Sequence, residues 1–96
     1  MKALCAEFTA SPGCEARLAA MVLELSAHVR KEPGNVLFEP CTRVENPRQY
    51  VVFEVCRDDA SFQAHLASSH STRFNDDLPA VIEGDASKLR WLEPVG

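Results

Sequence analysis

The sequence predicts a single α+β domain in which helices cover one face of an antiparallel sheet. Three observations predict it: several segments with strand-like alternation or β-prone composition, a long amphipathic segment with helical spacing, and breaks that contain proline with glycine or asparagine. The chain has 96 residues, of which 46% are hydrophobic and 25% are charged. This size and composition are typical of one folded domain, residues 1–96.

The first strand and the first helix follow from their periodicity. Residues 2–9 alternate between apolar residues and other types, as a half-buried strand does. The apolar side of that strand holds Leu4, Ala6 and Phe8. A helix is expected over residues 14–31, with Ser11 as its N-cap, because apolar residues recur there every three to four positions. These residues are Leu18, Val22, Leu25 and Val29.

A hairpin is expected in the middle of the chain. The segment Glu32-Pro33-Gly34 ends the helix, because proline disfavours helical geometry in the residue before it and glycine accepts left-handed geometry. Two strands follow, over residues 35–43 and 50–57, and turn residues lie between them. One side of the later strand holds Val51, Phe53 and Val55, and the other holds Tyr50, Val52, Glu54 and Cys56.

A second helical region and a last strand complete the predicted elements. Asp58 or Asp59 caps a helix in which Phe62, His65, Leu66 and Ser69 recur at helical spacing, so His65 lies on or beside its buried face. Residues 71–83 contain Pro79, so we expect two short helical pieces there. The segment S-K-L-R-W-L-E alternates as a final strand.

The order of these elements, β-α-β-β-α-β, is that of a ferredoxin-like fold with an antiparallel sheet. Both helices then lie on one face, which leaves the face with Val51, Phe53 and Val55 uncovered. An uncovered apolar face in a small protein is most often covered by a second copy of the chain. We therefore expect a homodimer formed through the open sheet face.

Composition argues against several partners. The net charge of −4 and the pI near 5.3 leave no basic stripe for phosphates, so no nucleic acid partner is expected. No apolar stretch approaches the ~20 residues that span a bilayer, and the first residues do not resemble a signal sequence, so we expect a cytoplasmic protein with no membrane partner. The cysteines stand singly, without C-x-x-C or Cys/His clusters, and predict four free thiols and no metal.

Several segments together resemble the antibiotic biosynthesis monooxygenase family. The resembling segments are Glu32-Pro33-Gly34, Phe38-Glu39, Asn46-Pro47, Phe53-Glu54, Ala64-His65, Ser68-Ser69-His70 and Phe74. The resemblance covers nearly the whole chain and implies a dimeric α+β barrel with a ligand cavity in each subunit. Known members include cofactor-independent oxygenases of quinols and anthrones, haem-degrading enzymes, an isomerase of a phosphorylated signalling sugar and many proteins of unknown role.

The chain also departs from this family. Members often carry tryptophan two residues after the glutamate of the third strand, where this chain has Cys56. The haem-degrading branch needs an asparagine on the first strand and a histidine late in the second helical region. The corresponding positions here are Ala6 and about Asn75, which argues against haem degradation.

The resemblance implies a monooxygenase that needs no cofactor and acts with O2 on a quinol, anthrone or similar hydroxylated aromatic. Such an enzyme needs a base and an apolar pocket. His65 is the best candidate base, because an unperturbed imidazole accepts a proton near neutral pH. The further catalytic candidates are Glu54 and His70, and the expected substrate-binding residues are Tyr50, Cys56, Phe38 and Phe74.

Two other functions remain open from the sequence. The same cavity could serve an isomerase or ring-opening enzyme for a small polar metabolite, which would need a cationic pocket from Arg43, Arg57 and Arg73. Alternatively, the chain is a non-catalytic ligand-binding or stress-related dimeric module. In that case His65 and Glu54 have purely structural hydrogen-bonding roles.

Overall fold

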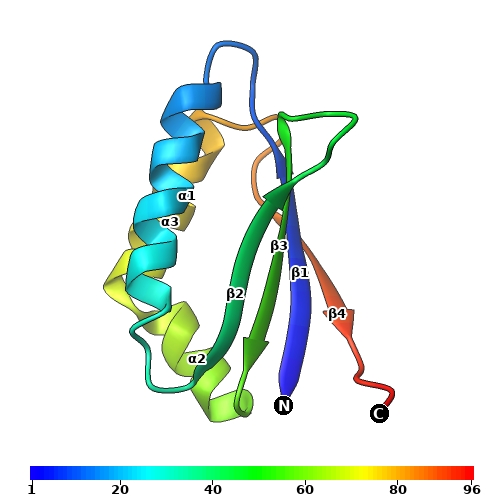
Figure 1. Cartoon of the computed structure of the whole chain (residues 1–96). Helices are drawn as coiled ribbons and strands as arrows, with labels where there is room; N and C mark the ends of the chain where they lie inside the picture. The colour runs from blue at the N-terminus through cyan, green and yellow to red at the C-terminus, as the bar shows by residue number, and fades with distance from the viewer.

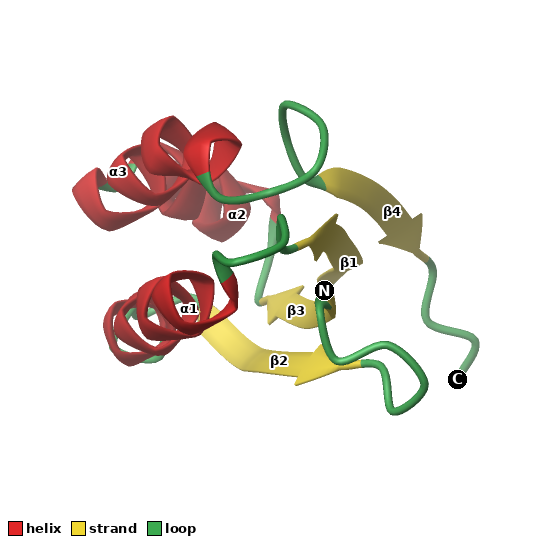
Figure 2. Cartoon of the chain, turned by 90° about the horizontal axis from the view of Figure 1, so that it is seen from above, coloured by secondary structure: helices red, strands yellow, loops and turns green.

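A computed structural model describes all residues 1–96 and confirms the predicted element order. The elements are β1 (Lys2–Thr9), α1 (Glu15–Val29), β2 (Asn35–Thr42), β3 (Gln49–Cys56), α2 (Asp59–Ala67), α3 (Ser69–Asp77), the 3-10 turn η1 (Leu78–Ala80) and β4 (Lys88–Leu92). All three α-helices lie on one side of the sheet (Figures 1 and 2). The fold is therefore α+β and ferredoxin-like.

The sheet has the strand order β2-β3-β1-β4, and every neighbouring pair is antiparallel. The register places Leu4 of β1 and Phe38 of β2 on either side of Glu54 of β3. Between Asn35 and Leu37 the register of β2 shifts, a bulge that inserts one extra residue at the strand start. As a result, these three central side chains share the sheet face that the helices cover.

The predicted alternation of faces is confirmed in β1, whereas in β3 Val55 is buried like its neighbours Glu54 and Cys56 and is not part of the uncovered surface. Leu4, Ala6 and Phe8 are all buried. Ala6 and Phe8 belong to the main core with the buried residues of α1 and η1, whereas Leu4 packs in a smaller cluster with Cys56 and Phe62. The buried apolar residues of α1 are Leu18, Val22 and Val29. No helix of the structure is long and apolar enough to cross a membrane.

The helix starts differ from the sequence-based expectation at one position. Ser11 does not cap α1: its carbonyl accepts from the amide of Cys14 at 2.9 Å, and Cys14 itself occupies the N-cap without a side-chain hydrogen bond. The cause is the intervening turn, in which Gly13 has φ 89° and delays the helix. By contrast, Asp58 caps α2 as expected and accepts a hydrogen bond from the amide of Ser61.

The second helical region bends at Ser68. The backbone of Ser68 is extended, with ψ 150°, so α2 ends there, and its side chain accepts from the amide of Ser71 and caps α3. Pro79 lies in η1, so the expected division of residues 71–83 into two pieces is confirmed, although α3 begins earlier, at Ser69. This bend turns the start of α3 toward the end of α1, as the contacts described below show.

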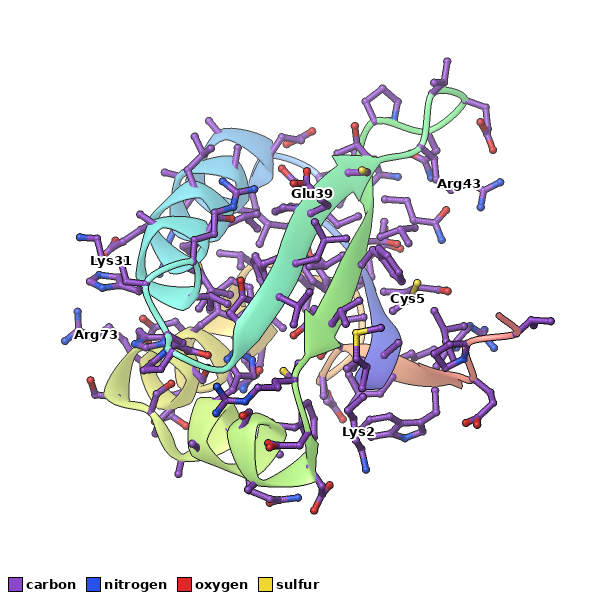
Figure 3. The ribbon with its side chains drawn as sticks, turned by 60° about the horizontal axis from the view of Figure 1, so that its bottom comes forward. Lys2, Cys5, Lys31, Glu39, Arg43 and Arg73 are labelled. Atoms are coloured by element: carbon purple, nitrogen blue, oxygen red, sulfur yellow. The ribbon has the colours of Figure 1, made fainter.

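The second sheet face carries no helix. Phe53 is 36% exposed on it, and Cys5 lies on the same side, away from the helices (Figure 3). At the sheet edge, every residue of β4 is exposed, including Leu89 and Trp91. The homodimer expected through this face stays a prediction.

Candidate functional site

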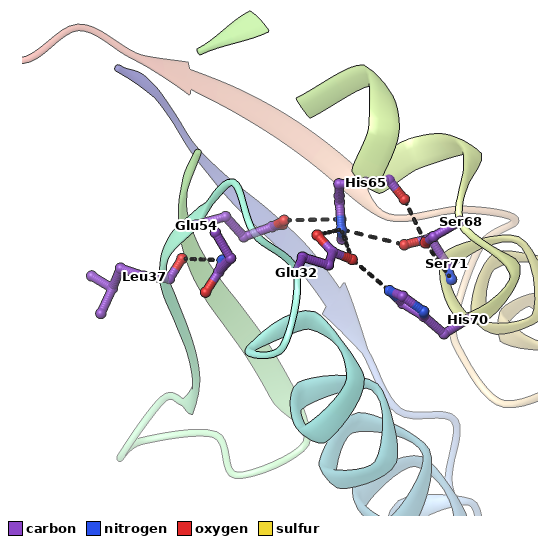
Figure 4. A network of polar contacts seen from close by, with 8 residues as sticks. Glu32, Leu37, Glu54, His65, Ser68, His70 and Ser71 are labelled. Atoms are coloured by element: carbon purple, nitrogen blue, oxygen red, sulfur yellow. Dashed lines mark hydrogen bonds and ion pairs between the residues drawn. The ribbon is translucent and has the colours of Figure 1, made fainter. Parts of the chain in front are cut away.

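His65 is the centre of a group of polar side chains between the sheet and the helices (Figure 4). From the Asp58 cap, α2 turns Phe62 and His65 toward the interior, and His65 is only 8% exposed. The two ring nitrogens of His65 face different carboxylates. Nδ1 lies 3.1 Å from both oxygens of Glu32, and Nε2 lies 3.4 Å from Oε1 of Glu54.

Glu32 reaches this group from the turn that follows α1. The amide of Glu32 donates to the carbonyl of Val29 at 2.9 Å, so the chain makes one further turn before it enters β2. Gly34 then passes very close to α2: a Cβ at Gly34 would lie 2.2 Å from Oγ of Ser61. Only glycine permits this approach, which holds the turn against α2 and keeps Glu32 beside His65.

His70 binds the same carboxylate from α3. Its Nε2 lies 2.5 Å from Oε2 of Glu32, and its ring stacks on that of His28 with centroids 5.4 Å apart. The hydroxyl of Ser71 lies 3.4 Å from Nδ1 of His65. One carboxylate thus joins side chains of α2 and α3, and the donor atoms of Glu32, His65 and His70 all lie within 4.8 Å of one another.

The electrostatics of His65 combine two opposing effects. Burial disfavours the imidazolium and lowers its pKa, whereas hydrogen bonds and charges from Glu54 and Glu32 raise it. The two carboxylates outweigh burial, so the pKa of His65 lies above its ordinary value of 6.5. The two carboxylates therefore favour the imidazolium form of His65 more than water does.

An apolar cavity of about 160 Å³ adjoins this group, between the sheet and the helices. Eleven of its sixteen lining residues are hydrophobic. The apolar lining is Leu4, Ala6, Phe8, Val22, Leu25, Phe38, Val52, Phe62, Leu66, Phe74 and Leu89, and the polar lining is Glu54, His65, Ser71, Asn75 and Ser87. The cavity is therefore an apolar space with few polar groups, among them Glu54 and His65.

Four of the seven predicted site residues lie on this cavity. They are His65, Glu54, Phe38 and Phe74. His70 does not line it, but lines a separate pocket of about 120 Å³ that also contains His28 of α1. Glu32 links His70 to His65 of the cavity by hydrogen bonds, and the two pockets share Leu25 and Phe74 in their linings.

Tyr50 and Cys56 are absent from the cavity lining. The ring of Tyr50 stacks on Phe8 at 5.3 Å, and Cys56 is buried against Leu4 and Phe62. Burial raises the pKa of both the Tyr50 phenol and the Cys56 thiol. Both residues share the strand face of Glu54, but they stand at opposite ends of β3, about 20 Å apart at ~3.3 Å per residue, so a small cavity cannot contact both.

The three arginines do not form a cationic pocket. Arg43 pairs with Glu45 in the loop between β2 and β3, and Arg73 lies on the helix layer far from it (Figure 3). Arg57 pairs with Asp58 at 3.7 Å. The cavity lining contains no lysine or arginine, so the cationic site expected of a phosphorylated substrate is missing from it.

Sequence reasoning missed Glu32 as a site residue. It treated Glu32-Pro33-Gly34 only as the end of a helix. One local signal was available: an acidic residue just beyond a helix C-terminus is unfavourable there, because the helix dipole favours cations at that end. An acid that stands in such a place has a partner elsewhere in the fold, here two histidines.

Comparisons with known proteins agree with this architecture. The sequence profile described as antibiotic biosynthesis monooxygenase matches residues 1–77. Among curated proteins, none matches the chain. A crystal structure of an antibiotic biosynthesis monooxygenase has 22% identity, 100% coverage of both chains and a TM-score of 0.92.

Two further solved structures have the same fold. PA3566 from Pseudomonas aeruginosa has 25% identity, with 99% of this chain and 94% of that chain covered and a TM-score of 0.90. Rv0793 from Mycobacterium tuberculosis has 19% identity, with 99% and 95% covered and a TM-score of 0.91. These likenesses establish the fold, and the profile match covers well over half of the sequence. The chain therefore belongs to the antibiotic biosynthesis monooxygenase family.

Proposed function

We propose that this protein is a cofactor-independent monooxygenase that acts on a single-ring hydroxylated aromatic, such as a quinol, with O2 as the second substrate. The observation that carries the proposal is the apolar cavity of about 160 Å³ with Glu54 and His65 in its lining. An apolar protein cavity of about 150 Å³ holds one benzene ring. A single-ring quinol therefore matches the cavity in size and in apolar character.

Glu54 is the proposed base. Both ring nitrogens of His65 already face carboxylates, whereas one oxygen of Glu54 has no hydrogen-bond partner in the protein. That oxygen accepts the proton of the substrate hydroxyl. The His65 imidazolium lies beside it and stabilises the negative charge that develops on the deprotonated ring and on reduced oxygen.

The redox balance requires no external reductant. The deprotonated quinol gives electrons to O2, one oxygen atom enters the ring as a hydroxyl group, and the other leaves as water. The substrate ends as a hydroxylated quinone and supplies all four electrons. Phe38 and Phe74 form part of the apolar wall and position the ring against Glu54.

Oxygen uptake by metal-free protein tests the proposal. Single-ring quinols, naphthols and anthrones are compared with wild type, Glu54→Gln and the matched control Glu39→Gln, an exposed glutamate on the neighbouring strand. We expect saturable uptake with the single-ring quinols that Glu54→Gln loses and Glu39→Gln retains. Uptake no faster than the spontaneous reaction, or uptake unchanged in Glu54→Gln, contradicts it.

We also propose that the protein works as a homodimer through the open sheet face. The support is the apolar surface that no helix covers, with Phe53 36% exposed and Leu92 of the edge strand β4 41% exposed on the same side of the sheet. Coverage of these side chains by a second copy removes apolar surface from water and stabilises a chain of only 96 residues.

A further inference from the structure

We propose that Glu32, His65 and His70 form a binding site for one divalent transition-metal cation of the Zn²⁺ type. The three residues come from the turn after α1, from α2 and from α3, and their side chains converge (Figure 4). The site lies beside the cavity and shares only His65 with its lining. It is a second site, and the proposed oxidation does not require it.

The distances match a site that needs little rearrangement. The donor atoms of the three residues all lie within 4.8 Å of one another, with His65 Nδ1 3.1 Å from Glu32 and His70 Nε2 2.5 Å from it. Ligands about 2.1 Å from a tetrahedral zinc ion lie about 3.4 Å from one another. A cation therefore requires shifts of about 1 Å, which side-chain rotation at His70 and Glu32 supplies.

The outer partner of the site is also present. A histidine that ligates a metal almost always donates its other ring N–H to a carboxylate, a backbone carbonyl or water, which fixes the tautomer and the ring orientation. Here Nδ1 of His65 faces Glu32, and Nε2 faces Oε1 of Glu54 at 3.4 Å. His70 is held from outside by ring stacking on His28.

Access and charge favour a cation. The side chains of Glu32 and His70 are 16% and 21% exposed, so the site is shielded but reachable. Glu32 and His65 also line an open groove of about 410 Å³. Arg57 is the one lysine or arginine in the lining of this groove, and the Arg57 side chain is 65% exposed and paired with Asp58. The carboxylates of Glu32 and Glu54 carry two negative charges that compensate the cation.

The donor set determines which cation fits. Two imidazoles and one carboxylate suit Zn²⁺ and similar transition metals, whereas Mg²⁺ and Ca²⁺ prefer all-oxygen sites. Three protein ligands leave the fourth position of a tetrahedral ion open for water or another ligand.

Isothermal titration of tag-free, chelator-stripped protein with ZnCl₂, without any aromatic substrate, tests this site. We expect one Zn²⁺ per chain and no heat of binding with MgCl₂. Glu32→Gln and His70→Asn, each of which removes one ligand, weaken binding by at least tenfold. Glu54→Gln, which removes the outer partner, weakens it about 10–100-fold. The matched control Glu39→Gln changes an exposed glutamate of β2 that is not among the three ligands, and it binds as wild type does.

Nitrogen NMR of the histidine rings in wild-type protein gives a readout that no variant's folding affects. Addition of Zn²⁺ shifts Nδ1 of His65 and Nε2 of His70 far more than either ring nitrogen of His28, which binds no metal. Any one of three results overturns the proposal. These are the absence of stoichiometric binding, an affinity equal to that of wild type in folded Glu32→Gln and His70→Asn, and an NMR shift confined to His28. Because neither measurement involves oxygen or substrate, failure of the proposed oxidation leaves these results unaffected.

Discussion

The close approach of Gly34 to α2 predicts that Gly34→Ala destabilises the protein. The added Cβ would lie 2.2 Å from Oγ and 2.3 Å from Cβ of Ser61, about 1.2 Å short of the 3.4 Å at which ordinary van der Waals contact begins. Rotation of the Ser61 side chain cannot relieve the clash, because its Cβ is attached directly to the backbone. The first turn of α2 must therefore move away from the turn that carries Glu32.

The expected loss follows from what overpacking costs in other proteins. Inserting a methyl group where the backbone must shift lowers the free energy of unfolding by about 1–3 kcal/mol. In a domain of this size each kcal/mol lowers Tm by roughly 4–8 °C. Urea unfolding followed by circular dichroism, at one fixed protein concentration, measures the change.

A double-mutant cycle with Ser61 tests the cause. Ser61→Gly removes both clashing atoms and leaves only a Cα at 3.3 Å from the added Cβ, so Gly34→Ala should cost much less in that background. Ser61→Ala is the matched control, because it keeps the Cβ at 2.3 Å and should give no rescue. A loss below about 0.5 kcal/mol for Gly34→Ala, or equal losses in all three backgrounds, would refute the reasoning.

Three other predictions concern the site, the core and the open face. In metal-free buffer, NMR titration should place the pKa of His65 above 6.5, and Glu54→Gln should lower it. Because the pKa of His65 is raised in the folded state, its contribution to stability is complete below pH 6.5 and is lost as pH rises through the folded-state pKa. A contribution of His65 that grows as pH rises through these values would contradict the raised pKa. Leu78 is 1% exposed, so Leu78→Ala should lower the free energy of unfolding by about 2–5 kcal/mol. Leu23 is 72% exposed, so Leu23→Ala should change that free energy by less than about 0.5 kcal/mol. Urea unfolding measures both changes, and equal losses would be inconsistent with the core described here. Phe53→Glu should convert a dimer into a monomer in sedimentation velocity, and a monomeric wild type at micromolar concentration would rule out the dimer.

The element order and the faces of the strands could be predicted because they are local properties. Leu4, Ala6 and Phe8 alternate with period two, and this pattern alone indicates which side of β1 is buried. The buried position of His65 followed in the same way from its spacing to Phe62 on α2. Local chemistry was less reliable at helix starts, because the Gly13 turn overrode the capping tendency of Ser11.

The candidate site was only half predictable, since its contacts join residues that are distant in sequence. Glu32 and His65 are 33 positions apart, and Glu32 and His70 are 38 apart. No periodicity links such residues. Their meeting depends on the angle at which α1 ends and on the bend at Ser68 between α2 and α3.

By itself, the sequence determined the class of fold, the buried faces of its strands and helices, and the placement of His65 and Glu54 on the covered side of the sheet. The physical reason is that hydrophobic periodicity acts along the chain and is complete within each element. Two features were decided only by the tertiary structure. The first is the position of the cavity along β3, which excludes Tyr50 and Cys56 from its lining. The second is the contact of Glu32 with both His65 and His70. These outcomes depend on packing distances between elements, which no single segment of the sequence specifies.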